Sequence, residues 1–285
     1  TYPLKEKDPV PNAALPSITA AASLPKEADL LVVGLADASD GPVLVGVPEE
    51  LDKAWVKRHG TSLLESARSM GAAAKPGTTV VLPGQPGLVV TGIGGVDVTP
   101  EQVRRAAGNA VRAAAKVAGD RTLAVALSFE AIEPEVLRGV AEGALLGAYG
   151  YAKETRQEAK RPLGSLVVVS PAKDAKAHVD EATVVATAVC RARDWVNTPP
   201  NALYPETFAD AARALARDAR LDVEVLDEKA LARGGYGGIL GVGGGSSRPP
   251  RLVRIEYNPR GAKTHLALVG KGITFDTGGL NVKPA

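Results

Sequence analysis

Apolar and polar positions alternate in blocks along the first half of the chain, and these blocks predict strands followed by helices. Short apolar runs bounded by glycine or polar residues are typical of strands, whereas Glu49 to Met70 has helical spacing interrupted by Gly60. The alternation predicts an α/β domain with a largely parallel sheet flanked by helices. The expected strands are Leu30–Leu35, Val43–Val47, Thr78–Leu82, Gly87–Ile93 and Leu123–Phe129.

Two helices are expected among these strands, and one has a clear start signal. The sequence TPEQ, from Thr99 to Gln102, is a capping-box pattern with proline in the first helical position, so a helix should run from there to about Ala118. A second helix is expected over 134–149. The first 24 residues are rich in proline and alanine and are expected to lie loosely on the surface.

A charged, apolar-poor stretch at 152–164, AKETRQEAKRPLG, is the expected linker between two domains. It would separate an amino-terminal α/β domain, residues 1–162, from a second α/β domain that begins at residue 163. Each domain is expected to contain a largely parallel sheet flanked by helices. The strands expected after the linker are Ser165–Ser170, Val223–Leu226, Arg251–Tyr257 and Leu266–Val269. The helices expected there are Val179–Val196, Pro205–Arg220 and a short helix after Asp227.

Composition narrows the functional classes. Charged residues make up 23% of the 285 residues and the net charge is +2, so binding to nucleic acid or to an anionic membrane is not indicated. No apolar stretch is long enough to span a membrane. The single cysteine, Cys190, allows no intramolecular disulfide, which fits a reducing compartment and predicts a cytoplasmic protein.

Charged residues follow the last predicted strand in the sequence VGKGITFDTGGLNVKP. In open α/β sheets ligands gather beyond the carboxyl ends of strands, so Lys271, Asp276 and Lys283 are candidates for chemistry. Glycines between them let the backbone approach a ligand closely. On these residues alone, two solvated lysines and a loop-capping aspartate are the simpler interpretation.

Two upstream blocks change that interpretation. They read ARDWVNTPPNALYP, from Ala192 to Pro205, and GYGGILGVGGGSSRPPRLVRIEY, from Gly235 to Tyr257. Together with the last stretch, and in this order, they resemble the leucyl aminopeptidase (cytosol aminopeptidase) family, whose members are two-metal exopeptidases. The resemblance is close over about the last third of the chain and looser before it.

The resemblance implies a role for each candidate residue. Lys271 would be a metal ligand, which requires its ammonium to lose a proton beside the dication. Asp276 would bridge two divalent ions, zinc or manganese, and Lys283 would stay charged and stabilise the developing oxyanion of the substrate carbonyl. The implied reaction is hydrolysis by a metal-activated water, with bicarbonate as a base, releasing amino-terminal residues from peptides with a free amino terminus.

The family pattern continues with a further aspartate and an NTDAEGR segment, which this sequence does not contain. Lys271 and Asp276 are then only two metal ligands, so the 285-residue chain alone is expected to be inactive and to hold the first part of a catalytic domain. The resemblance also implies a homo-hexamer with a non-catalytic amino-terminal domain tied to assembly. The alternative is a non-catalytic binding or assembly protein on the same scaffold.

Other chemistries have weaker support. The turn TGIGGVD, from Thr91 to Asp97, follows a strand as a phosphate-binding loop would, but it lacks the third glycine of the dinucleotide fingerprint, so a structural tight turn is the favoured interpretation. The glycine-rich loop at 241–248 lacks the lysine of a Walker motif and is expected to be flexible backbone. The three histidines, His59, His178 and His265, share no metal-ligand spacing.

Overall fold

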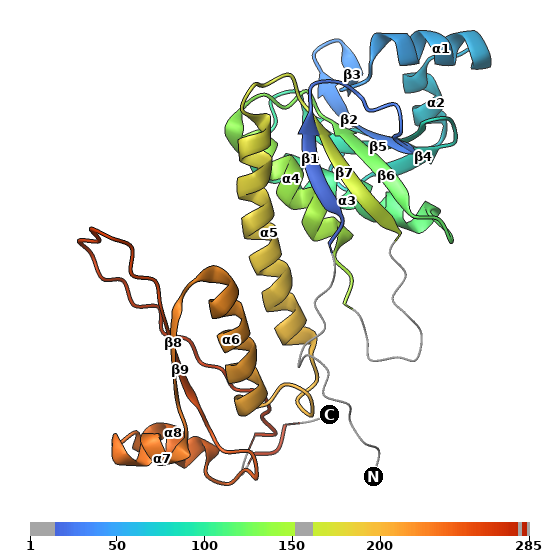
Figure 1. Ribbon diagram of the computed structural model, residues 1–285. Helices are drawn as coiled ribbons and strands as arrows, with labels where there is room; N and C mark the ends of the chain where they lie inside the picture. The colour runs from blue at the N-terminus through green and yellow to red at the C-terminus, as the bar shows by residue number, and fades with distance from the viewer. Residues whose placement is uncertain (1–14, 152–161, 279–280, 284–285) are drawn as a thin grey trace. The chain divides into compact units, whose positions relative to one another are not determined.

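The computed structural model describes residues 15–151, 162–278 and 281–283, and the chain divides into two compact units between Ala192 and Arg193. We refer to the described residues before this division as the amino-terminal unit and to those after it as the carboxy-terminal unit. Figure 1 labels the helices and strands of both.

The amino-terminal unit is built on a seven-stranded sheet. Its strands are β1 (Ser17–Ala21), β2 (Leu30–Ala38), β3 (Gly41–Val45), β4 (Thr79–Leu82), β5 (Gly87–Gly95), β6 (Leu123–Ser128) and β7 (Leu163–Val169). Its helices are α1 (Glu49–His59), α2 (Leu63–Ser69), α3 (Pro100–Val117), α4 (Pro134–Ala148) and α5 (Ala175–Asn197), whose last turn lies past the division. Within the described ranges, no helix is long and apolar enough to cross a membrane.

The sheet is largely parallel, which confirms the predicted fold class for this unit. The strand order is β1-β7-β6-β2-β5-β4, with β3 beside β2, and among the described strands of this sheet only the β2–β3 and β4–β5 pairs are antiparallel. Strand β2 lies between two parallel neighbours, so that Val32 pairs with Val89 on one side and with Leu127 on the other.

Strand β2 is apolar from Leu30 to Ala36 because both faces of the sheet are covered there. Val32 belongs to a core cluster that includes residues of α3 and α4, whereas Leu31 and Val33 belong to a second cluster that includes Leu63 and Ala67 of α2. Successive side chains of a strand point to opposite faces, so a strand covered on both faces needs apolar residues throughout. This burial explains why periodicity located the strand from the sequence.

Glycines let helices α3 and α4 approach closely. A Cβ atom on Gly143 would lie 2.0 Å from the carbonyl oxygen of Arg104, and one on Gly147 would lie 2.5 Å from that of Gly108. Any larger residue at these positions would clash with the backbone of the facing helix. The α3–α4 pair therefore depends on glycine for its spacing.

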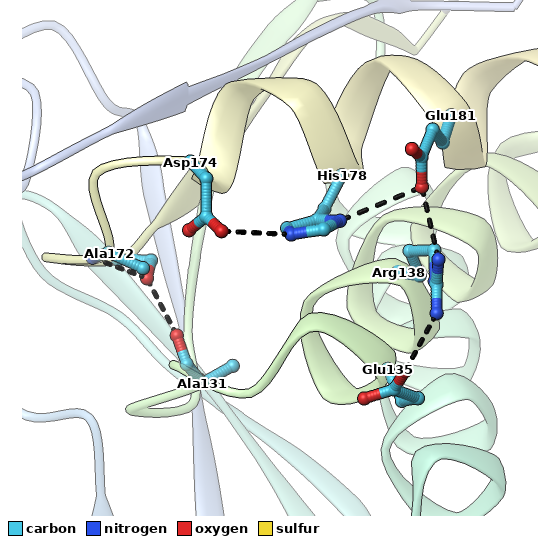
Figure 2. Close-up of polar contacts among 8 residues, drawn as sticks. Ala131, Glu135, Arg138, Ala172, Asp174, His178 and Glu181 are labelled. Atoms are coloured by element: carbon cyan, nitrogen blue, oxygen red, sulfur yellow. Dashed lines mark hydrogen bonds and ion pairs between the residues drawn. The ribbon is translucent and has the colours of Figure 1, made fainter.

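A polar network joins the first turns of α5 to α4 (Figure 2). His178 lies between two carboxylates, with Nε2 3.2 Å from Asp174 Oδ2 and Nδ1 3.6 Å from Glu181 Oε2. Arg138 of α4 pairs with Glu181 at 3.0 Å and with Glu135 at 2.9 Å. His178 is thus part of a polar network, in which the contact between Arg138 and Glu181 links α4 to α5.

The carboxy-terminal unit differs from the expected parallel sheet. Its strands β8 (Asp222–Leu226) and β9 (Leu252–Glu256) form an antiparallel pair, and the described residues add no further strand to it. The helices around this pair are α6 (Pro205–Ala219), α7 (Glu228–Arg233) and α8 (Gly237–Gly243). Helix α8 covers part of the loop that was expected to be flexible backbone.

The strand predicted at Leu266–Val269 does not form. These residues lie outside regular structure, and the exposed fractions of Leu268 and Val269 are 90% and 97%. A strand buried on both faces needs partners for its backbone N–H and C=O groups, and no described strand pairs with this segment. The apolar run was correctly located, but the prediction of a buried strand was wrong for the described residues.

Two further expectations fail in the amino-terminal unit. Residues 17–21, expected to lie loosely on the surface, form β1, because they pair in parallel with β7 and satisfy their backbone groups there. Strand β7, expected to open the second domain, pairs with β6 in the first sheet. Most of the predicted linker, residues 152–161, lies outside the described residues.

We predict that Gly143→Ala lowers the free energy of unfolding by about 2 kcal/mol. The new methyl group would clash with the Arg104 carbonyl, and that overpacking outweighs a gain of about 1 kcal/mol in helix propensity. Urea unfolding followed by circular dichroism measures the change. Gly241→Ala is the matched control, since Gly241 also lies in a helix, α8, and a Cβ atom there meets nothing within 4 Å. Equal stabilities for the two variants would contradict the packing account.

Candidate metal and substrate site

The three candidate residues lie on the irregular segment that follows β9. Lys271 and Asp276 are exposed in the described part of this segment, and Lys283 lies shortly beyond them. The segment has neither helix nor strand to fix it, so local hydrogen bonds decide its shape. These bonds centre on Asp276.

Asp276 accepts two hydrogen bonds, one on each carboxylate oxygen. The backbone N–H of Gly278 donates to Oδ1 at 2.9 Å, and the ammonium of Lys283 donates to Oδ2 at 2.8 Å. A backbone bond from the Lys283 N–H to the Thr277 carbonyl, 2.8 Å long, closes the same turn. The structure thus brings Asp276 and Lys283 into direct contact, seven residues apart in sequence.

Gly278 is required for this turn. Its φ is +100°, and a Cβ atom there would lie 2.1 Å from the carbonyl oxygen of Asn281. Only glycine adopts such a backbone without strain. The glycine after FDT therefore has a structural reason: it lets the chain fold back so that Lys283 reaches the Asp276 carboxylate.

The environment of Asp276 holds its pKa below the ordinary aspartate value. The main cause is the hydrogen bond from Lys283, followed by that from the Gly278 N–H, with smaller contributions from the charges of Lys283 and Lys271. The carboxylate is therefore ionised at neutral pH. An ionised, exposed carboxylate is a suitable oxygen ligand for a divalent cation.

Lys271 and Lys283 differ in how they interact with Asp276. It acts on Asp276 through its charge, and no hydrogen bond or ion pair of Lys271 is seen with another described side chain. Its neighbour Gly272 rests against the ring of Phe208 in α6, where a Cβ atom would lie 3.4 Å from the ring edge. The two lysines that the sequence singled out thus differ in structure, because one is paired with the aspartate and the other is not.

The described residues include donor groups that suit a metal ion, but too few of them to complete a metal site. The carboxylate of Asp276 and the amine of a deprotonated Lys271 are suitable donors, yet zinc sites have three or four protein ligands. No cluster of three or more His, Cys, Asp or Glu side chains able to hold a metal occurs in the part of the chain that the structure describes. These two residues can belong to a metal site but do not complete one.

Sequence reasoning missed Arg248, which joins two of the sequence blocks. Its Nη1 donates to the carbonyl oxygens of Pro200 and Asn201, at 2.9 and 3.2 Å, and its guanidinium lies 4.0 Å from the centre of the Tyr204 ring. The carbonyl groups of the proline turn could not be assigned partners from the sequence. The sequence shows only an arginine followed by two prolines, and this pattern does not identify the groups that the arginine contacts.

A hollow of about 710 Å³ lies elsewhere, in the amino-terminal unit beyond the carboxyl ends of β5 and β6. Among the described residues that line it, the charged ones are Asp97, Glu130 and Glu133. Three carboxylates disfavour a phosphate group there. The nearby Gly92 is also needed for packing, since a Cβ atom would lie 2.2 Å from the Lys75 carbonyl oxygen, which favours the structural interpretation of this glycine-rich turn.

Two family models match the chain, one after the other. The amino-terminal domain of the cytosol aminopeptidase family matches residues 32–156, and the catalytic domain of the same family matches residues 190–285. The second match contains Lys271, Asp276 and Lys283.

Curated relatives agree with these matches. A probable cytosol aminopeptidase of Cutibacterium acnes is 45% identical over 261 residues, which cover 90% of this chain and 51% of the relative. One from Micrococcus luteus is 45% identical over 287 residues, covering 95% of this chain and 54% of the relative. The chain therefore spans about half the length of the curated relatives it matches.

Solved structures that share the fold are also matched over about half of their own length. The bottromycin maturation enzyme BotP is 31% identical with a TM-score of 0.71, covering 90% of this chain and 52% of its own. BotP in complex with Mn is 32% identical with a TM-score of 0.69, covering 90% and 50%. A tomato leucine aminopeptidase mutant, 22% identical with a TM-score of 0.69 and covering 86% and 52%, agrees in fold.

We predict that Lys283→Met raises the pKa of Asp276 towards the ordinary aspartate value, because the variant loses the largest cause of the depression. Carbon NMR of the aspartate carboxyl groups measures it. Lys271→Met is the control and should shift this pKa less, since Lys271 acts only through its charge. If Asp276 titrates at the same pH in the wild type and both variants, the ion pair does not exist in solution.

The same contact predicts how local order depends on pH. The folded-state pKa of Asp276 lies below its unfolded value, so the stabilisation is complete above the unfolded pKa and is lost as the pH falls through the folded pKa. Backbone amide signals of Thr277 and Gly278 should therefore change only in that acidic range.

Proposed function

Because the chain belongs to the cytosol aminopeptidase family, we propose that the whole protein is a metal-dependent aminopeptidase that releases amino-terminal residues from peptides. The observation that carries the proposal is the match of the catalytic-domain model to residues 190–285, with Lys271, Asp276 and Lys283 inside it. The names of the curated relatives support an aminopeptidase. They do not favour the alternative of a non-catalytic assembly protein.

We further propose that the whole protein binds two divalent ions, zinc or manganese, with bicarbonate as a base. BotP, which has been solved with Mn, supports manganese as a candidate. Bound divalent ions would supply Lewis acidity to the scissile carbonyl and lower the pKa of the attacking water. Asp276 and Lys271 would be ligands, and the remaining ligands would come from residues outside those described.

The roles of the chain's own side chains follow from their contacts. Asp276 is held ionised by Lys283 and Gly278, so it can bind cations without first losing a proton. Lys271 must be neutral to donate a lone pair to a metal ion. Lys283 contacts the Asp276 carboxylate, and a protonated amine is what an oxyanion requires.

The amino-terminal unit is proposed to serve assembly rather than catalysis, in a homo-hexamer located in the cytoplasm. A separate family model matches this part of the chain, and the relatives are named cytosol aminopeptidases, which supports the assignment. The largely parallel sheet and the close α3–α4 pair make it a rigid body on which contacts between subunits can be built.

We predict that hydrolysis of leucine p-nitroanilide by the whole protein is abolished by a chelator and restored by zinc, manganese or cobalt. The 285-residue chain alone should show no activity under any of these conditions, because Lys271 and Asp276 are two ligands of a site that needs more. Activity is followed by absorbance, and bound metal by mass spectrometry. A whole protein that keeps its metal but hydrolyses no substrate would instead support the non-catalytic alternative.

We predict that replacing Lys271 and replacing Lys283 in the whole protein have different effects on metal content and activity. Lys271→Ala should lower metal content and activity together, and excess metal should partly restore both, because a ligand is lost. Lys283→Ala should keep the metal but lower kcat by about 10²–10³, the usual cost of losing one oxyanion donor.

Lys283→Arg is the matched control for charge. It should not restore full activity, since a planar guanidinium does not take the place of a compact ammonium. Metal loss in Lys283→Ala, or unchanged turnover, would show that Lys283 does not have the proposed role.

A further inference from the structure

Arg248 links two parts of the carboxy-terminal unit that are distant in sequence. It follows α8 and reaches back to the turn that precedes α6, where it donates to the carbonyls of Pro200 and Asn201 and covers the Tyr204 ring. The sequence separation is 48 residues for Pro200 and 47 for Asn201. A guanidinium carries several donors in a fixed plane, so one side chain can make all these contacts at once.

The turn that Arg248 holds has few donors of its own. Pro199 and Pro200 lack backbone N–H groups, and the Pro199 carbonyl already accepts from the N–H groups of Ala202 and Leu203. The next two carbonyls, of Pro200 and Asn201, point to Arg248. Arg248 therefore sets the path of the chain into Tyr204, the residue that begins α6.

The backbone at Arg248 is held by neighbouring contacts. Its N–H donates to Ser246 Oγ at 3.1 Å, and beyond the two following prolines Arg251 pairs with Glu228 of α7 at 2.8 Å. Arg251 also approaches Glu206 in the first turn of α6, at 3.8 Å, with its side chain 14% exposed. A rigid proline pair between two anchored arginines gives Arg248 a defined position from which to hold the turn.

Helix α6 connects the turn that Arg248 holds to the segment that carries Lys271. Phe208 lies one turn after Tyr204, with its N–H donating to the Tyr204 carbonyl at 2.9 Å, and its ring packs edge-on against Trp195 with centroids 5.0 Å apart. Gly272, the residue after Lys271, lies near the same ring, since a Cβ atom added to it would be 3.4 Å from the Phe208 ring edge. A shift at the amino end of α6 therefore moves the surface on which the Lys271 segment rests.

We propose that Arg248 is a positioning residue that places Lys271 for metal binding, an inference that rests on the proposed function. Arg248 acts through Tyr204 and Phe208 and touches neither metal nor substrate. Arg248 is exposed, so replacing it opens no cavity in the core. The effect is therefore separable from a general loss of structure.

The test compares Arg248→Met with Arg254→Met in the whole protein. Arg254 is the matched control: it is 65% exposed and pairs with Glu224 and Glu256 on the β8–β9 pair, away from the turn before α6. Manganese affinity is measured by titration of the metal-free protein, and hydrogen exchange of peptides spanning 266–276 is measured without metal. Thermal unfolding of each variant gives the stability.

Arg248→Met should weaken manganese binding about tenfold, as is typical when support for a ligand is removed, and should speed exchange in 266–276. Arg254→Met should change neither. Arg248→Lys should be intermediate, since a compact ammonium can donate to the carbonyls or lie over the Tyr204 ring but cannot do both at once as the guanidinium does. Wild-type affinity and exchange in Arg248→Met would overturn the proposal.

Tyr204 supplies an independent variant if Arg248→Met folds poorly. Tyr204→Phe keeps the ring face and should behave as wild type, whereas Tyr204→Leu should reproduce the effect of Arg248→Met. In the double variant, the effects of Tyr204→Leu and Arg248→Met should not be additive. If the wild type binds no manganese, the proposed function fails, and the metal-free exchange still decides whether Arg248 orders the Lys271 segment.

Discussion

Strands need partners, and this requirement determines how the described chain is built. Every backbone N–H and C=O buried in a protein has to be hydrogen bonded, so an apolar segment becomes a buried strand only beside another. In the amino-terminal unit each strand has a partner, and even β1 is held by β7 across a long sequence separation. In the carboxy-terminal unit the apolar run at 266–269 has no described strand partner and stays exposed, so strand pairing does not shape the segment that carries Lys271 and Asp276.

The same requirement explains which elements could be predicted from sequence. Strand β2 and helix α3 were predictable because a run of buried residues and a capping box are local signals, and both are present in the structure. Strand β1 was missed because its residues, SITAA, are small and weakly apolar, and only pairing with β7 makes them a strand. The assignment of β7 to a second domain failed for a related reason, since a polar linker does not reveal which sheet the next strand joins.

At the candidate site, the sequence named residues but not their contacts. Lys271, Asp276 and Lys283 came from a motif, and the structure adds that Asp276 and Lys283 are paired while Lys271 is apart from them. Local composition also gave no reason to look at Arg248, because its partners are carbonyl groups exposed by a proline turn nearly fifty residues away. Together these contacts describe two lysines in different environments: Lys283 is paired with the Asp276 carboxylate, and Lys271 precedes Gly272, which lies near the Phe208 ring of α6.

We propose that the whole protein removes residues from the free amino terminus of a peptide. The direct measurement is mass spectrometry of products after incubating the manganese-loaded protein with a leucine-initiated peptide and with its acetylated form. The account predicts stepwise release of single residues from the free peptide and no cleavage of the acetylated one. Cleavage of both peptides at an internal bond, or of neither, would contradict it.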